Sequence, residues 1–251
     1  MPHKIAIVAA MKREVRSLVH SAGWRKSSAV RAAYGCYESD SAVVVCAGIG
    51  AEFGHAAAES LVASFQPRLL VSAGLAGALV SELSVGQIFV PVTIVSSVKG
   101  GRINLSHGAG NGVLVSASGI AGPEAKRLLA RQYGAQAADM EAAYVAEVAQ
   151  LHGVPFVAVK AISDEWDFPM PDMDAFVSAE GKFETAQFAL HTTMHPSQWR
   201  TVIRLAANSS RAIQSLNRAL RNLLEHGSLE HHEFISSLAA ERTADHEESG
   251  R

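Results

Sequence analysis

Two carboxylates follow apolar runs of the chain and a third stands at the start of an apolar helix pattern, and carboxylates in such places are candidates for acid–base chemistry. Glu14 comes soon after the run KIAIVAA (4–10), Glu141 belongs to the acidic pair of ADMEAAYVAE, and Asp164 follows the run VPFVAVKAIS. Ligands of open α/β sheets bind at the carboxyl ends of the strands. We therefore predict that the three carboxylates converge on one cleft.

Two glycine-containing turns follow further apolar runs, at 48–50 (GIG) and at 72–77 (SAGLAG). Glycine lets the backbone approach a ligand closely, so both turns are candidate contacts. The first turn does not extend to the dinucleotide fingerprint Gly-x-Gly-x-x-Gly, because position 53 is Phe. The pattern therefore gives no support for a dinucleotide site.

Each of these residues also has a purely structural interpretation. Glu14 would be stabilised by the dipole of a helix that starts there, and Asp164 could cap the turn after its strand. His55 lies in an alanine-rich segment, which is more typical of a packed or half-exposed histidine than of a catalytic one. The order and context of the carboxylates favour the functional interpretation.

The segments that must position these residues alternate between strand and helix patterns. Runs rich in β-branched residues, apolar on both faces, are typical of buried parallel strands. We predict a three-layer α/β/α fold with a central mixed, mostly parallel sheet, plus C-terminal helices. We expect strands at 4–10, 41–48, 68–74 and 154–163, shorter strands at 32–38, 86–92 and 112–118, helices at 11–23, 51–66 and 140–153, and a loop at 99–112.

The C-terminal part has a different pattern. From Pro196 onward apolar residues recur at helical spacing, with arginines on the other face. The helix could simply pack on the domain, or it could handle a greasy substrate or contact a membrane surface. We predict one domain over 1–225, with an amphipathic helical extension at 196–225 and a disordered tail at 226–251.

Composition limits the class of protein. The 251 residues have a formal net charge of −2, so we expect no nucleic-acid partner. The two cysteines, Cys36 and Cys46, fit a reducing compartment, and no Cys/His spacing predicts a metal site. The apolar run at the start is too short for a signal peptide or a transmembrane span. We expect a cytoplasmic protein.

The motifs AAMKREV, AGIG, PRLLVSAGLAGAL, VGQIFVP, DMEAAYVAEVA and VPFVAVKAISDEWD occur between Lys4 and Asp167. In their order and spacing they resemble the nucleoside phosphorylase and nucleosidase superfamily, in particular the methylthioadenosine and adenosylhomocysteine nucleosidases. Leu75, Asp139 and the C-terminal part are similar to the hopanoid-associated phosphorylases, which implies adenine release from an adenosyl hopanoid.

The resemblance implies a role for each residue. Asp164 would be the acid near purine N7, a role that needs a protonated carboxyl, which an apolar strand end favours. Glu141 would bind the ribose hydroxyls with Met140 packed beneath the sugar, while Asp139 caps the helix. Glu14 would orient the attacking water. Further substrate contacts are expected at Gly48, Gly74, Leu75, Ile120 and Ser163.

Phosphate is the competing nucleophile, because phosphorylases surround this place with arginines. Arg13 and Arg16 lie near Glu14, but the first strand is not followed by Gly-x-x-Arg and Leu75 offers no hydroxyl. We predict hydrolysis, with no cofactor and with phosphate as the alternative co-substrate. Family members commonly form dimers or trimers, so we expect a homodimer.

Departures from the family pattern keep other functions open. The segment Thr93–Gly112 is shorter than in the family, and SASGI at 116–120 replaces the base-contacting GDAF. The alternatives are a methylthioadenosine/adenosylhomocysteine nucleosidase, a purine nucleoside-binding protein without catalysis, and an interaction protein that uses the C-terminal helix.

Overall fold

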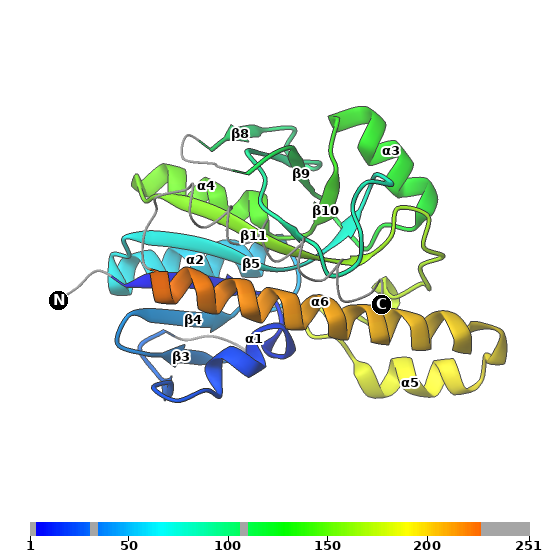
Figure 1. The fold of residues 1–251 in the computed structure, drawn as a ribbon, viewed down its shortest axis with the longest axis horizontal. Coiled ribbons are helices and arrows are strands. Elements are labelled where there is room, and N and C mark those ends of the chain that lie inside the picture. The colour runs from blue at the N-terminus through cyan, green and yellow to red at the C-terminus, as the bar shows by residue number, and fades with distance from the viewer. Residues whose placement is uncertain (1–3, 31–34, 106–109, 227–251) are drawn as a thin grey trace, which may run out of the picture.

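The computed structural model describes residues 4–30, 35–105 and 110–226. These residues form three layers, with a mixed 11-stranded sheet between helices on both faces (Figure 1). The predicted three-layer fold with a mixed sheet is confirmed. The strands are β1 (Ile5–Ala9), β2 (Arg25–Ser27), β3 (Cys36–Glu38), β4 (Ala42–Cys46), β5 (Leu69–Ala78), β6 (Ile88–Phe89), β7 (Thr93–Ser96), β8 (Arg102–Asn104), β9 (Val113–Ser116), β10 (Ala137–Asp139) and β11 (Phe156–Asp164). The helices are α1 (Lys12–Val19), α2 (Ala51–Phe65), α3 (Pro123–Tyr133), α4 (Ala142–His152), α5 (Thr185–Thr193) and α6 (Trp199–His226).

Strand β1 explains why the apolar runs are continuous. Ile5 and Ile7 belong to a core cluster with residues of α1 and α6, whereas Ala6 and Val8 belong to a cluster with residues of α2 and α4. Alternate residues of a strand point to opposite faces, so a strand covered by helices on both sides needs apolar residues at every position. The parallel pairs of β1 with β4 and β5 therefore form the buried centre of the sheet.

The sheet has a gap along one edge of β5, between its partners β1 and β10. Strand β5 pairs with β1 over Leu69–Ala73 in parallel, and with β10 over Gly77 and Ala78 in antiparallel direction. Strand β11 occupies the other edge of β5, over Leu70–Gly77. On the β1 side, residues 74–76 of β5 therefore have no strand partner among the described residues, and the sheet opens where β1 and β10 diverge.

Several elements differ from the sequence prediction. The segment 99–112, predicted as a loop, contains β8, which forms an antiparallel hairpin with the unpredicted β7. Gly100, with φ of 70°, lies in its turn, so the glycines at the start of the segment belong to the hairpin turn. Residues 106–109 of the predicted loop lie outside the described residues. The strand expected at 86–92 is only the two residues of β6. Helix α3 and strands β2 and β10 were also not predicted, and 32–34 of the strand expected at 32–38 lie outside the described residues.

The predicted helical extension is present as α6, which packs on α1 and on the sheet. Its second half is buried through Ala212, Leu216 and Leu220, and α5 lies beside its first half (Figure 1). The packing interpretation is therefore confirmed for the second half, and residues 227–251 of the expected tail lie outside the described residues. No described helix is both long enough and apolar enough to span a membrane.

A buried amide joins α6 to α1, beside the exposed contact of Arg221 with Ser17. Asn217 of α6 is 1% exposed. Its Nδ2 donates to the carbonyl oxygen of Glu14 at 2.7 Å, and its Oδ1 accepts from the backbone N–H of Leu18 at 2.9 Å. The side chain thus bridges residues one helical turn apart in α1, which fixes the helix that carries Glu14 against α6.

Replacing this amide tests its contribution to stability. We expect Asn217→Leu to lower the free energy of unfolding by about 1–3 kcal/mol, because buried polar groups lose their partner. Asn208→Leu, on the same helix, is the control, since Asn208 is half-buried and its amide only reaches 3.5 Å from Glu165. Equal midpoints of urea unfolding for the two variants would contradict the assigned role of Asn217.

Candidate active site

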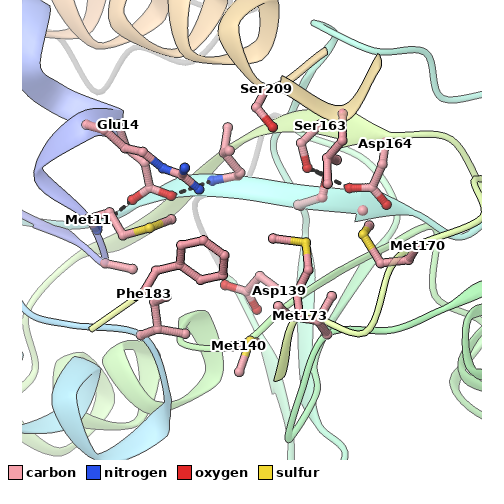
Figure 2. Close-up of a pocket in the computed structure, with 18 of the residues that line it drawn as sticks. Met11, Glu14, Asp139, Met140, Ser163, Asp164, Met170, Met173, Phe183 and Ser209 are labelled. Carbon is pink, nitrogen blue, oxygen red and sulfur yellow. Dashed lines mark hydrogen bonds between the residues drawn. The ribbon is translucent and has the colours of Figure 1, made fainter. Parts of the chain in front are cut away.

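A cavity of about 540 Å³ opens where β5 lacks a strand partner. Glu14, Glu141 and Asp164 all line it, as the sequence analysis predicted. Figure 2 shows Glu14 on one side of the pocket and Ser163 and Asp164 on the other. Of the other predicted contacts, Leu75, Ile120, Met140 and Ser163 are also lining residues.

Two predicted contacts, Gly48 and Gly74, are not among the residues that line the cavity. Gly48 donates its N–H to the carbonyl oxygen of Ala10 at 2.9 Å. At Gly74 an added Cβ would lie 3.6 Å from Glu14 Oε1 and 3.7 Å from the Lys160 ammonium. These are ordinary van der Waals distances, so Gly74 lies beside the two charged side chains without having to be a glycine to admit them.

Glu14 is held by the first turn of α1. Its Oε2 accepts from the N–H of Met11 at 2.9 Å, and its Oε1 accepts from the N–H of Leu75 at 3.4 Å. Burial raises the pKa of Glu14, although the Met11 N–H and the charges of Lys160 and Arg13 oppose the shift. A desolvated carboxylate with a raised pKa is a stronger base than an exposed one, so Glu14 can accept a proton from a bound nucleophile.

A buried ion pair fixes Asp139, one of the residues that line the cavity. Asp139, at the end of β10, pairs with Lys160 of β11 at 2.8 Å. It also accepts from the N–H of Ala142 at 2.9 Å and from Ser116 Oγ at 2.6 Å. The predicted capping of α4 by Asp139 is therefore confirmed, and the same carboxylate neutralises a lysine. Burial depresses the pKa of Lys160, but the carboxylates of Asp139, Glu141 and Glu14 outweigh it, and the net shift is upward.

Glu141 lies beside this pair, and its Oε1 accepts from the N–H of Gly50 at 2.8 Å. Gly54 of α2 permits the approach, because an added Cβ there would lie 3.2 Å from the Cβ of Glu141. Burial and the negative charge of Asp139 raise the pKa of Glu141 to about 7, against the opposing effects of Lys160 and the Gly50 N–H. Near neutral pH this side chain can thus accept hydrogen bonds from hydroxyls in one protonation state and donate in the other.

Asp164 is aimed by a β-bulge. The pairing of β11 with β5 slips at Ser163, between Ile162 and Asp164, and bulges near sites re-aim side chains. Asp164 Oδ1 accepts from Ser163 Oγ at 2.6 Å, and Oδ2 forms a buried ion pair with Lys126 of α3. The apolar surroundings that the sequence analysis expected for Asp164 are not found, because the ammonium of Lys126 lies against its carboxyl group.

Sequence reasoning missed both lysines. Lys160 interrupts an otherwise apolar strand, and a lysine at such a position needs a buried partner, so a signal was present. Lys126 gave no comparable signal, because lysines are common on the exposed faces of helices. Only the packing of α3 on β9 and β10 brings Lys126 to Asp164.

The remainder of the cavity wall is largely apolar. Methionines and Phe183 lie between Glu14 and Asp164 (Figure 2), and α6 contributes a further face. The apolar members from these segments are Met11, Met140, Met170, Met173, Phe183, Phe188, Val202, Leu205 and Ile213. Of the described lysines and arginines, Arg13 and Lys126 line the cavity, whereas Arg16 does not. In the ranges described, no three His, Cys, Asp or Glu side chains form a metal-binding group.

The family model of the Phosphorylase superfamily matches residues 4–121 and 104–192. The chain belongs to this superfamily. It is therefore a nucleoside phosphorylase or nucleosidase, and the predictions of that family and of an enzyme of that class are confirmed.

Two curated relatives of this superfamily member are 5′-methylthioadenosine/S-adenosylhomocysteine nucleosidases. The enzyme from Bacillus pumilus is 26% identical over 197 residues, covering 64% of this chain and 85% of the relative. The enzyme from Shewanella loihica is 25% identical over 215 residues, covering 71% and 94%.

Solved structures share the fold. The 5′-methylthioadenosine nucleosidase of Arabidopsis thaliana has a TM-score of 0.70 at 18% identity, covering 89% of this chain and 95% of that one. The futalosine hydrolase of Helicobacter pylori has a TM-score of 0.64 at 19% identity, covering 95% and 98%.

The raised pKa of Glu141 predicts a pH-dependent gain in stability on mutation. When the pKa of a carboxyl is higher in the folded state than its unfolded value of 4.5, the free energy of unfolding falls as pH rises from 4.5 to about 7. We expect Glu141→Gln to raise the free energy of unfolding at pH 8 by up to about 3 kcal/mol, and to have little effect near pH 4.5.

The control for this measurement is Glu38→Gln, which should show the opposite sign. The hydrogen bond from Lys4 lowers the pKa of Glu38, so its charged form stabilises the fold at pH 8. Chemical denaturation of both variants at several pH values makes the comparison. A Glu141→Gln variant that is less stable than the wild type at pH 8 would contradict the assigned shift.

Proposed function

We propose that this enzyme hydrolyses the N-glycosidic bond of a purine nucleoside, releasing adenine from an adenosyl-type substrate. The observation that carries the proposal is the meeting of Glu14, Glu141 and Asp164 around one cavity. The names of the two curated relatives, both nucleosidases of adenine-containing compounds, support the choice of base.

The charges of the cavity fit this reaction. Cleavage develops positive charge on the ribose and negative charge on the departing purine. Glu141 accepts hydrogen bonds from the ribose hydroxyls and opposes the positive charge, with Met140 packed against the sugar. Asp164 and Ser163 lie at the purine end, with Ile120 beside the base. Leu75 lines the wall near Glu14.

Water is the nucleophile that the site favours. Glu14 is buried and accepts two backbone hydrogen bonds near the end of β1, where its negative charge would repel phosphate and can take a proton from water. Phosphate would need several cations, and Lys126 is already paired with Asp164. Phosphorolysis is therefore the second candidate, with Arg13 as its one cationic support among the described lining residues.

We propose that the 5′ substituent is large and apolar, such as a hopanoid. Phe183, Phe188, Val202 and Leu205, in and around α5 and α6, extend the cavity wall with apolar surface. A methylthioadenosine/adenosylhomocysteine nucleosidase is the alternative, favoured by the curated relatives. We further propose a cytoplasmic homodimer, which sedimentation of the full chain would test.

A lipid-linked substrate must be reached from a membrane, and the α5–α6 segment offers a contact surface. Leu190, Met194, Trp199 and Ile203 are each at least 47% exposed, and the exposed Arg200 lies among them. Apolar side chains with a neighbouring arginine suit an interface with anionic lipid. We propose that this surface contacts the membrane peripherally.

Glu14→Gln tests the hydrolytic role. We expect turnover of methylthioadenosine or a 5′-alkylated adenosine to fall about 100-fold or more, because the base that accepts the proton of water is lost. Adenine release is measured in buffers with and without phosphate. Glu52→Gln is the matched control, since Glu52 is also in the first turn of a helix but is exposed and does not line the cavity. Adenine release that requires phosphate would select phosphorolysis.

The membrane contact is tested by vesicle sedimentation. We expect Leu190→Ser/Met194→Ser/Ile203→Ser to bind vesicles of mixed phosphatidylcholine and phosphatidylglycerol several-fold more weakly than the wild type. Release of adenine from water-soluble substrates should not change. Leu151→Ser is the control, because Leu151 is 76% exposed on α4. Equal binding by the control and the triple variant would remove this surface from the proposal.

A further inference from the structure

We infer that Lys126 supplies, through Asp164, the proton that the departing purine takes up. The inference rests on the proposed function and deepens it, because it assigns the acid of that reaction to a pair of residues instead of to one carboxyl. Lys126 comes from α3, an element that the sequence analysis did not predict.

The pair is built into the fold. Lys126 is 1% exposed, yet it is one of the residues that line the cavity. Its ammonium donates to Asp164 Oδ2 and, at 2.6 Å, to the carbonyl oxygen of Glu165. Gly77 of β5 leaves the space: an added Cβ there would lie 2.9 Å from Asp164 Oδ2 and 3.3 Å from the Lys126 nitrogen.

The pair decides where the proton resides before the reaction. An ionised carboxylate accepts hydrogen bonds and has no proton to give. Protonating Asp164 would leave the ammonium of Lys126 buried without its counter-ion, which is strongly unfavourable. Before substrate reacts, the proton available at the purine end of the cavity is therefore on Lys126.

Each electron pair and proton of the cleavage has a defined destination. As the bond between the anomeric carbon and purine N9 breaks, its electron pair stays on the purine. A proton passes from the Lys126 ammonium to Asp164 and from Asp164 to purine N7, which leaves a neutral amine beside a carboxylate. Water attacks the anomeric carbon and gives its proton to Glu14. Return of that proton from Glu14 to the amine through solvent restores the enzyme.

The position of Lys126 follows from the segment that precedes α3. The segment at 116–120, which departs from the family motif, leads through Gly122 into α3. The first turn of that helix carries Lys126, and its N–H donates to the carbonyl oxygen of Gly122 at 2.9 Å. The chain thus brings a cation to the purine end shortly after Ile120, which also lines the cavity.

Two substitutions separate a proton source from a simple counter-ion. Lys126→Met removes both functions, whereas Lys126→Arg keeps the charge but has a guanidinium that does not give up its proton in proteins. We expect kcat/KM for the adenine nucleoside to fall about 100-fold or more in both variants. In Lys126→Met the remaining activity should be confined to lower pH, because Asp164 must then be protonated itself.

A second substrate shows that the rest of the site is intact. Nitrophenyl riboside has a leaving group that departs without a proton, so its cleavage by both variants should stay within about threefold of the wild type. Lys4→Met is the control for the loss of an ion pair, since Lys4 pairs with Glu38 at 2.5 Å outside the cavity. Its activity on both substrates should match the wild type.

The outcomes are distinct. Wild-type rates in Lys126→Arg would overturn the inference, because charge alone would then be sufficient. Equal losses on both substrates, or an unshifted pH profile in Lys126→Met, would also overturn it. A wild-type enzyme that releases no adenine from any nucleoside would remove the proposed function itself, a failure that needs no variant to detect.

Discussion

The buried ion pair between Asp139 and Lys160 is the interaction on which the rest of the site depends. Lys160 stands in the middle of an apolar strand, where an unpaired ammonium would be strongly destabilising. Asp139 compensates it and, by accepting from the N–H of Ala142, fixes the start of α4. Glu141 lies between these two contacts in the chain, so its position follows from theirs. The same ammonium also moderates the raised pKa of Glu14 and Glu141.

The two lysines divide the cavity into ends of different charge. At the purine end Lys126 and Asp164 form a neutral pair. Around Lys160, by contrast, three carboxylates share one ammonium, and Glu14 and Glu141 have raised pKa values as a result of burial. This arrangement places negative potential where a glycosidic cleavage makes the sugar positive, and a neutral pair with a transferable proton where the purine becomes negative.

The sequence predicted the centre of the fold because burial on both faces leaves a direct signal. Strands β1, β4, β5 and β11 are apolar at nearly every position, and the ends of β1 and β11 located Glu14 and Asp164. Glu141 was found instead from the acidic pair that begins the helix pattern of α4. Strand β10 has only three residues, too few for any periodicity to be recognised.

Contacts between distant segments left no local pattern either. The partner of Asp164 is 38 residues away in sequence, on a helix whose two arginines are exposed surface residues. Gly48 and Gly74 show the opposite case, in which a sequence signal was present but the expected ligand contact is not found. Their residue type indicated close approach to a ligand, but neither lines the cavity, and an added Cβ at Gly74 would make only ordinary contacts with Glu14 and Lys160.

Helix α6 connects the chemistry to the choice of substrate. Through Asn217 it is fixed to α1, the helix that holds Glu14, while its first half supplies Val202 and Leu205 to the cavity wall. A change in the apolar wall can therefore leave the sheet with Asp139 and Asp164 in place, because strand pairing and the two lysines hold them. Helix α6 also links the apolar wall to Glu14. A substituent that displaced the first half of the helix would move α1, and Glu14 would shift with it. Substrate selection by this wall should accordingly appear in turnover as well as in binding.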